Sequence, residues 1–169
     1  MNKGLEYIEA MRLYDMPPEQ IEIAVHRESI VHSLVEFVDG AILAQLGTAD
    51  MRMPIQYALT WPERTVGPAT PLDLFSCPPL SFARPDVETF RCLGLALECA
   101  RKGGTSTAVL NGANEAAVAL FLEDKISFLD IARLVECALE RVPSVDTPDL
   151  ETIMAADRAA REAVYEAMR

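Results

Sequence analysis

The stretch SIVHSLVEFVDGAILAQLG, residues 29–47, gives the clearest indication of local structure in this sequence. An Asp-Gly pair at 39–40 lies between two segments rich in β-branched and aromatic residues. Asp-Gly suits the two positive-φ positions of a type I′ turn, so the pattern predicts a β-hairpin. With a two-residue loop, the expected cross-strand pairs are Val38 with Ala41, Phe37 with Ile42 and Val35 with Ala44. On that register His32 lies on the same strand face as Ile30 and Leu34.

The residues before the hairpin predict one helix and one further strand. Apolar residues recur at helical spacing over 2–14, and Pro17 and Pro18 end that register. In IEIAVH, residues 21–26, apolar residues alternate with others, which predicts a strand.

After the hairpin the sequence predicts a short helix and then a long connector. ADMRMPIQYALTWP predicts a helix that begins near Pro54 and ends at Trp61. Residues 62–90 hold six of the eleven prolines and show no sustained period. This composition is typical of an extended, partly stiff segment.

The pattern after Phe90 is helical throughout. The first of these helices ends at the Gly103-Gly104 pair, and a later one opens with a capping box formed by Ser127 and Asp130. The last helix is expected to take Thr147 as its N-cap and Pro148 as its first residue. These helices predict a small bundle, and the chain as a whole reads as an α+β protein.

Composition excludes several classes of protein. The 169 residues carry a net charge of −11, which argues against a nucleic-acid partner bound through a basic face. No apolar run approaches the ~20 residues of a membrane span, and the first residues lack the apolar core of a signal peptide. The four cysteines form no CxxC pair, which is typical of reduced thiols. We therefore expect a cytoplasmic protein without membrane or nucleic-acid partners.

Two interpretations of the polar residues remain open on spacing alone. Glu6 and Glu9 can share one helical face, with Lys3 one turn earlier. They form either a solvated ion-paired surface or a site in which Glu6 binds a divalent metal and Lys3 attracts a phosphate. His32 is either a hydrogen-bonded core histidine or a functional one. Met51 needs no further explanation than that of a gap-filling core side chain.

Three segments together resemble a known family. They are NKGLEYIEA at 2–10, VHRESIVHSLVEFVDGAILAQLGTADMRMPIQYAL at 25–59 and GGTSTAVLNGANEAAVALFLEDKISFLDI at 103–131. They resemble the 1-deoxy-D-xylulose 5-phosphate reductoisomerases of the non-mevalonate isoprenoid pathway, which form 2-C-methyl-D-erythritol 4-phosphate. The family usually has other residues, Pro or Ala, at four positions, and these bear on local stability: Arg27, Ala49, Thr107 and Gly112.

The resemblance implies a domain organisation. Family members begin with an NADPH-binding domain, followed by a catalytic domain, a linker and a C-terminal helical bundle. Accordingly, residues 1–61 are expected to be the last part of the catalytic domain, with its helix and hairpin. Residues 62–90 are the proline-rich linker, and 91–169 the helical bundle. The NADPH-binding domain is expected to lie outside this chain.

The resemblance also implies roles for five residues. Glu6 matches the third carboxylate ligand of Mg²⁺ or Mn²⁺, whose other two ligands lie upstream of the motifs present. Asn2 and Lys3 match residues that contact the hydroxyls and phosphate of the sugar phosphate substrate. Met51 matches the nicotinamide side of the NADPH pocket, and His32 matches a histidine near the catalytic site.

These matches lead to expectations for the chain by itself. One metal carboxylate without a nucleotide domain predicts an inactive chain that binds Mg²⁺ weakly and no cofactor tightly. The family suggests a homodimer and a missing N-terminal domain as partners. Three origins stay open: a fragment of the enzyme, a stand-alone non-catalytic association module, or one half of a split enzyme.

Overall fold

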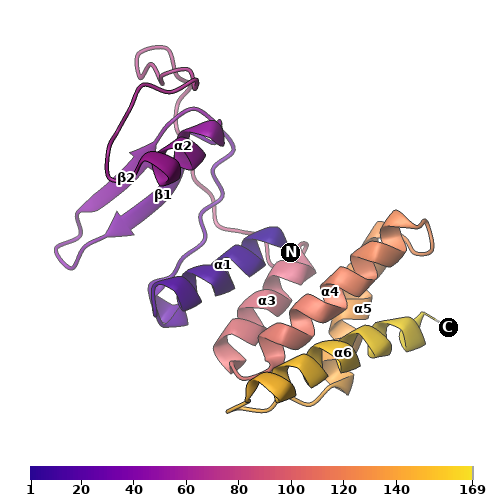
Figure 1. The fold of residues 1–169 in the computed structure, drawn as a ribbon. Coiled ribbons are helices and arrows are strands. Elements are labelled where there is room, and N and C mark those ends of the chain that lie inside the picture. Colours follow the sequence, from indigo (N-terminus) through magenta and orange to yellow (C-terminus); the bar gives the residue numbers. More distant parts are fainter. Residues whose placement is uncertain (169) are drawn as a thin grey trace. The chain divides into compact units, whose positions relative to one another are not determined.

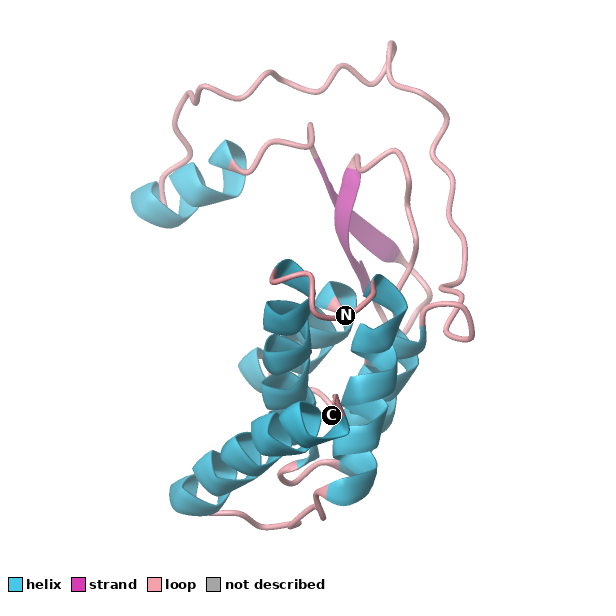
Figure 2. Cartoon of the chain, turned by 90° about the vertical axis from the view of Figure 1, so that its right-hand side faces the viewer, coloured by secondary structure: helices cyan, strands magenta, loops and turns pink. Residues whose placement is uncertain are grey.

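The computed structural model describes residues 1–168 and contains two compact units. One unit consists of Met1–Ile23 together with the chain from Asp86 on, and it is helical. The other, Ala24–Pro85, holds the hairpin and one helix. Figures 1 and 2 show these elements, and each unit is described by itself.

The helical unit is built around a central helix. Its elements are α1 (Asn2–Leu13), the short 3₁₀ turn η1 (Pro18–Gln20), α3 (Arg91–Lys102), α4 (Ser106–Leu122), α5 (Phe128–Arg141) and α6 (Leu150–Ala167). Helix α4 packs against both α5 and α6, and α1 packs against α3 (Figure 1). The largest fully buried apolar side chains are Leu110, Leu134, Val109, Val135 and Val164. The expected helical bundle is thus confirmed.

Close packing fixes α1 on this bundle. A Cβ on Gly4 would collide with the Cβ of Ala96 in α3, so the two helices approach each other closely at this point. Tyr7 is buried, and its hydroxyl donates a hydrogen bond to the Pro18 carbonyl at 2.6 Å. By packing, α1 therefore belongs with the helices that follow residue 86. The division at 1–61, 62–90 and 91–169 concerns the functional domains of a longer protein and stays a prediction.

Two of the three predicted helix boundaries in the bundle are confirmed. Gly103 ends α3 with a positive φ of 70°. Ser127 and Asp130 form the reciprocal capping box at the start of α5. The boundary of α6 is wrong, because its N-cap is Asp149, whose carboxylate accepts from the Thr152 amide at 2.8 Å. The helix therefore begins two residues later than Thr147 and Pro148 suggested, since a carboxylate cap satisfies the first free amides.

The hairpin is confirmed, but its predicted register is wrong by one residue. Strand β1 (Val31–Glu36) pairs with β2 (Ile42–Leu46) so that Glu36 faces Ile42. Within the turn only Gly40 has a positive φ, +82°, and its amide donates to the Phe37 carbonyl at 2.9 Å. The loop is therefore three residues long, Val38 to Gly40, the second common hairpin geometry. Asp39 instead accepts from the Ala41 amide.

A β-bulge interrupts β1 at His32. The pairing shifts between Val31 and Ser33, so strict alternation does not hold across this position. The common face expected for His32, Ile30 and Leu34 depended on that alternation, so the bulge removes the basis of that expectation.

The predicted strand at 21–26 is wrong. The only pairing there is an isolated antiparallel bridge between Val25 and Ala83. The partner segment carries Pro79 and Pro85 close to the bridge, and prolines cannot donate to a ladder. The alternating pattern therefore lacks a partner that could extend the pairing.

Helix α2 (Arg52–Thr60) begins two residues before the predicted Pro54. The Asp50 carboxylate accepts from the Arg52 amide at 3.0 Å, which supports the earlier start. Apart from the bridge at Ala83, residues 62–90 contain turns and bends but no helix or strand, as expected for the connector. Among residues 1–168, no helix is both long and apolar enough to cross a membrane.

Candidate functional site

Three of the predicted site residues meet at the start of α1. Asn2 donates from Nδ2 to Glu6 Oε1 at 2.6 Å, and Lys3 donates from Nζ to Glu6 Oε2 at 2.6 Å. Each carboxylate oxygen thus accepts one hydrogen bond. The sequence places these side chains one helical turn apart, and the close approach of Gly4 to α3 fixes the helix that carries them.

This cluster is open to solvent and easily rearranged. The Lys3 and Glu6 side chains are 69% and 45% exposed. An exposed ion pair of this kind contributes about 0–1 kcal/mol, so an incoming ligand can separate it at small cost. The first turn of α1 also carries the partial positive charge of a helix N-terminus, which favours an anion.

The described residues fit a divalent metal only in part. Mg²⁺ takes about six oxygen ligands in near-octahedral array. Within residues 1–168 no group of three or more His, Cys, Asp or Glu side chains is placed to hold a metal. Glu6 fits as one carboxylate ligand, and the remaining ligands are not supplied by the part of the chain that the structure describes.

His32 lies in the hairpin unit, at the bulge of β1. Its Nε2 is 3.2 Å from the carbonyl oxygen of Gly47, which can only accept. In this contact the ring nitrogen is the donor, and it ties the start of β1 to the residue after β2. The Gly47 amide donates to the Ile30 carbonyl at 3.0 Å, which closes the same end of the hairpin.

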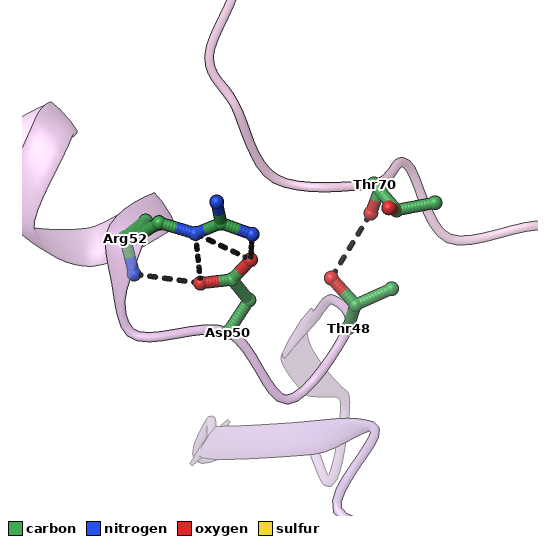
Figure 3. Close-up of polar contacts among 4 residues, drawn as sticks. All are labelled: Thr48, Asp50, Arg52 and Thr70. Atoms are coloured by element: carbon green, nitrogen blue, oxygen red, sulfur yellow. Dashed lines mark hydrogen bonds and ion pairs between the residues drawn. The ribbon is translucent and has the colours of Figure 1, made fainter.

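Met51 lies in a loop with several anchors, in the same unit as His32. Asp50 binds the Arg52 guanidinium through both carboxylate oxygens, with contacts of 2.6 to 3.0 Å (Figure 3). Thr48 Oγ1 donates to the Thr70 carbonyl at 3.0 Å. The Arg52 guanidinium lowers the pKa of Asp50 from its usual value. Met51 itself is 71% exposed, although both its neighbours are fixed.

The structure brings Asn2, Lys3 and Glu6 together in the helical unit. It places His32 and Met51 in the hairpin unit, where His32 contacts Gly47 and Met51 lies in the loop that follows Gly47. The predicted roles of all five residues remain predictions.

Polar contacts also hold the connector to the residues that precede the hairpin. His26 Nδ1 lies 2.8 Å from the Ser81 carbonyl, and its ring stacks on Phe82. Ser81 Oγ donates to Glu28 at 2.5 Å, and this hydrogen bond is the main cause that lowers the Glu28 pKa. These partners lie more than fifty residues apart in sequence, so no local pattern reveals them.

A small hollow lies between α2 and the connector. Its volume is about 140 Å³, and its walls include Tyr57, Arg64 and Thr70. The Arg64 guanidinium stands 4.0 Å above the ring of Tyr57. Thr70 lines this hollow and also accepts the hydrogen bond from Thr48, so the hollow adjoins the loop that carries Met51.

Comparison with known protein families shows to which family the chain belongs. The family described as the DXP reductoisomerase C-terminal domain matches residues 46–163. The chain belongs to the 1-deoxy-D-xylulose 5-phosphate reductoisomerase family.

Individual reductoisomerases match nearly the whole chain. The 1-deoxy-D-xylulose 5-phosphate reductoisomerase of Ectopseudomonas mendocina is 52% identical over 161 residues, covering 95% of this chain and 41% of that protein. The Acetivibrio thermocellus enzyme is 50% identical over 169 residues, covering 100% of this chain and 44% of its own length. The chain thus spans less than half the length of the curated relatives it matches.

Solved reductoisomerase structures share the fold. The Zymomonas mobilis enzyme in complex with NADPH matches with a TM-score of 0.90 at 47% identity, covering 99% of this chain and 44% of that one. A DOX-P reductoisomerase in complex with NADPH, fosmidomycin and magnesium matches with a TM-score of 0.92 at 44% identity, covering 99% and 43%. The α+β assignment and the family are therefore both confirmed.

Proposed function

We propose that this chain is part of a reductoisomerase that converts 1-deoxy-D-xylulose 5-phosphate to 2-C-methyl-D-erythritol 4-phosphate. It supplies two side chains that contact the substrate and one that binds the metal. The reaction uses NADPH and Mg²⁺ or Mn²⁺. The observation that carries the proposal is the cluster of Asn2, Lys3 and Glu6 on one turn of α1, in a member of the reductoisomerase family.

Each side chain of the cluster has a distinct task. The Glu6 carboxylate releases its two donors and binds the divalent cation as one of several oxygen ligands. The freed Lys3 ammonium then binds the substrate phosphate at the helix N-terminus, where an anion is favoured. The freed Asn2 amide donates to a substrate hydroxyl. In the unliganded cluster the three groups satisfy one another.

The cofactors supply the chemistry that these side chains cannot. A bound divalent metal polarises a carbonyl oxygen as a Lewis acid, and NADPH provides hydride for the reduction. The contribution of this chain is to orient the sugar phosphate and to complete the ligand set. By itself the chain is inactive and binds Mg²⁺ weakly, because Glu6 is a single carboxylate.

The hairpin unit contributes its own groups to the same proposal. Met51 contacts the nicotinamide side of the NADPH pocket, and His32, whose Nε2 contacts the Gly47 carbonyl, is a functional histidine. The enzyme acts as a cytoplasmic homodimer that associates through the hairpin. Its exposed apolar side chains, Leu34, Val35, Phe37, Ile42 and Leu43, support association.

The same hairpin favours a second candidate function. A stand-alone, non-catalytic module would also need an exposed apolar surface for association, and Leu43 is 65% exposed. Such a module would make no use of the Asn2, Lys3 and Glu6 cluster. The two candidates therefore differ in whether the chain restores turnover when a nucleotide-binding half is added.

The test is a mixing experiment. NADPH oxidation is followed with 1-deoxy-D-xylulose 5-phosphate and Mn²⁺, for the chain alone, for a separately expressed N-terminal half of a relative, and for the two together. The proposal expects turnover only in the mixture. Turnover by the chain alone would contradict the proposed need for further metal ligands, and silence in the mixture would favour the association module.

A further inference from the structure

The loop that carries Met51 is held more firmly than its exposure suggests. It joins the end of β2 to the start of α2, a position at which connecting segments are usually mobile. Its Asp50 amide donates to the Thr48 carbonyl at 2.7 Å, and its Asp50 carbonyl accepts from the Met53 amide at 3.2 Å. The backbone on both sides of Met51 is thus fixed by short-range hydrogen bonds.

The Asp50 carboxylate adds a side-chain restraint across Met51. It accepts from the Arg52 backbone amide and from two nitrogens of the Arg52 guanidinium (Figure 3). One carboxylate therefore binds both the backbone and the side chain of the residue that follows Met51. Bidentate guanidinium–carboxylate pairs fix orientation as well as distance. Residues 50 and 52 are therefore clamped to each other, and Met51 forms the apex between them.

Two further contacts anchor this apex to the rest of the unit. Thr48 is bound to the Thr70 carbonyl of the connector. The Met53 side chain lies against Gly47, where an added Cβ would come within 2.9 Å of its methyl carbon. Meanwhile Met51 remains 71% exposed. A large apolar side chain held out to solvent by a fixed backbone is available for contact with a ligand.

We infer that Asp50 is a positioning residue, which through Arg52 holds Met51 in place against the nicotinamide end of NADPH. This inference rests on the proposed function, in which Met51 contacts the cofactor. Asp50 acts only on the loop, so its loss should weaken cofactor binding without affecting the sugar phosphate. A preorganised contact residue contributes to affinity because its ordering cost is met before binding.

The test combines loop exchange and kinetics. Amide hydrogen exchange of residues 47–53 is measured in the chain itself for wild type and for Asp50→Asn. Kinetics are measured in the mixture with an N-terminal half for Asp50→Asn, Met51→Ala and the double variant. Glu123→Gln is the matched control, because it removes another exposed 2.6 Å ion pair, with Lys125, in the helical unit.

Positioning predicts that Asp50→Asn accelerates exchange at 47–53 and raises the KM for NADPH by about 5- to 10-fold, equal to about 1–1.4 kcal/mol. The KM for the sugar phosphate and kcat stay within about twofold, and Asp50→Asn adds nothing in the Met51→Ala background. Unchanged exchange, an unchanged KM for NADPH, or additive effects of the two substitutions would each overturn the inference. If Met51→Ala raises the KM and Asp50→Asn does not, the role of Met51 stands and that of Asp50 fails.

Discussion

Individual side chains in this protein act mostly through local hydrogen bonds. Glu6, Asp50 and Asp130 each accept from donors within four residues of themselves. Such contacts follow from spacing, so the sequence predicted the cluster at α1 and the capping box of α5. It could not predict that His26 contacts Ser81, because the connector that brings them together has no regular period.

Asp130 makes the stability of α5 depend on pH. Hydrogen bonds from Ser127, and then from Arg133, hold the pKa of this carboxyl below its ordinary value of 3.8. A depressed pKa in the folded state contributes stability above the unfolded pKa, and this contribution is lost as the pH falls through the folded one. Asp130→Asn should therefore lower the midpoint of thermal unfolding at pH 7.

The difference between the wild type and Asp130→Asn should shrink as the pH falls below the ordinary value of 3.8 and disappear once the native carboxyl is protonated. Thermal unfolding followed by circular dichroism measures both curves. In a Ser127→Ala background the pH-dependent difference should shrink, because the first cause of the shift has been removed. A difference that stays the same throughout the acid titration would contradict this account.

Helices and strands were predicted better in kind than in position. The hairpin and the bundle helices follow from periodicity, whereas the hairpin register depended on the loop type. Asp-Gly allows both a two-residue and a three-residue loop, and sequence alone does not separate them. The predicted start of α6 was wrong for a similar reason. Asp149 and Thr147 are both good N-caps, and only the packed helix selects one of them.

Helix α4 packs against α6 at Gly112, and this contact carries a prediction. A Cβ at Gly112 would lie 2.9 Å from the Asp157 carbonyl oxygen, a backbone atom that cannot swing away. Although Ala is the better helix former by about 1 kcal/mol, Gly112→Ala should reduce the free energy of unfolding by about 1–3 kcal/mol through overpacking. Urea unfolding measures the change.

Gly94→Ala in α3 is the matched control for Gly112→Ala. Its Cβ would come no closer than 3.3 Å to a neighbouring atom, so its cost should be smaller. If Gly112→Ala were as stable as the wild type, the close approach of α4 and α6 would be refuted.

At the level of the whole chain, family membership rests on order as well as on composition. The motifs at α1, the hairpin and α4 follow one another as in the reductoisomerases, and the relatives match 95–100% of the chain. Physical reasoning on the residues alone reached an α+β protein with an acidic surface. It could not reach the reaction, because one carboxylate, one lysine and one asparagine on a helix are also an ordinary solvated face.

Association through the hairpin is the prediction for the isolated chain. Multi-angle light scattering at millimolar concentration should give twice the monomer mass, because apolar side chains on both strands are exposed. Leu43→Glu places a charge on that surface and should shift the mass to the monomer. Leu122→Glu alters a similarly exposed leucine in the helical unit and should leave the dimer intact. A monomer mass for the wild type would count against association.

The central claim is that Glu6 belongs to the catalytic site, and one substitution pair tests it. Glu6→Gln and Glu9→Gln remove one exposed carboxylate each from the same helix, three residues apart. Turnover of 1-deoxy-D-xylulose 5-phosphate with NADPH and Mn²⁺ is compared for both variants, each mixed with an N-terminal half. The account predicts that Glu6→Gln lowers kcat/KM by about 100-fold or more, equal to about 2.7 kcal/mol of transition-state stabilisation, while Glu9→Gln stays within about threefold of the wild type. Equal activity of Glu6→Gln and the wild type would contradict it.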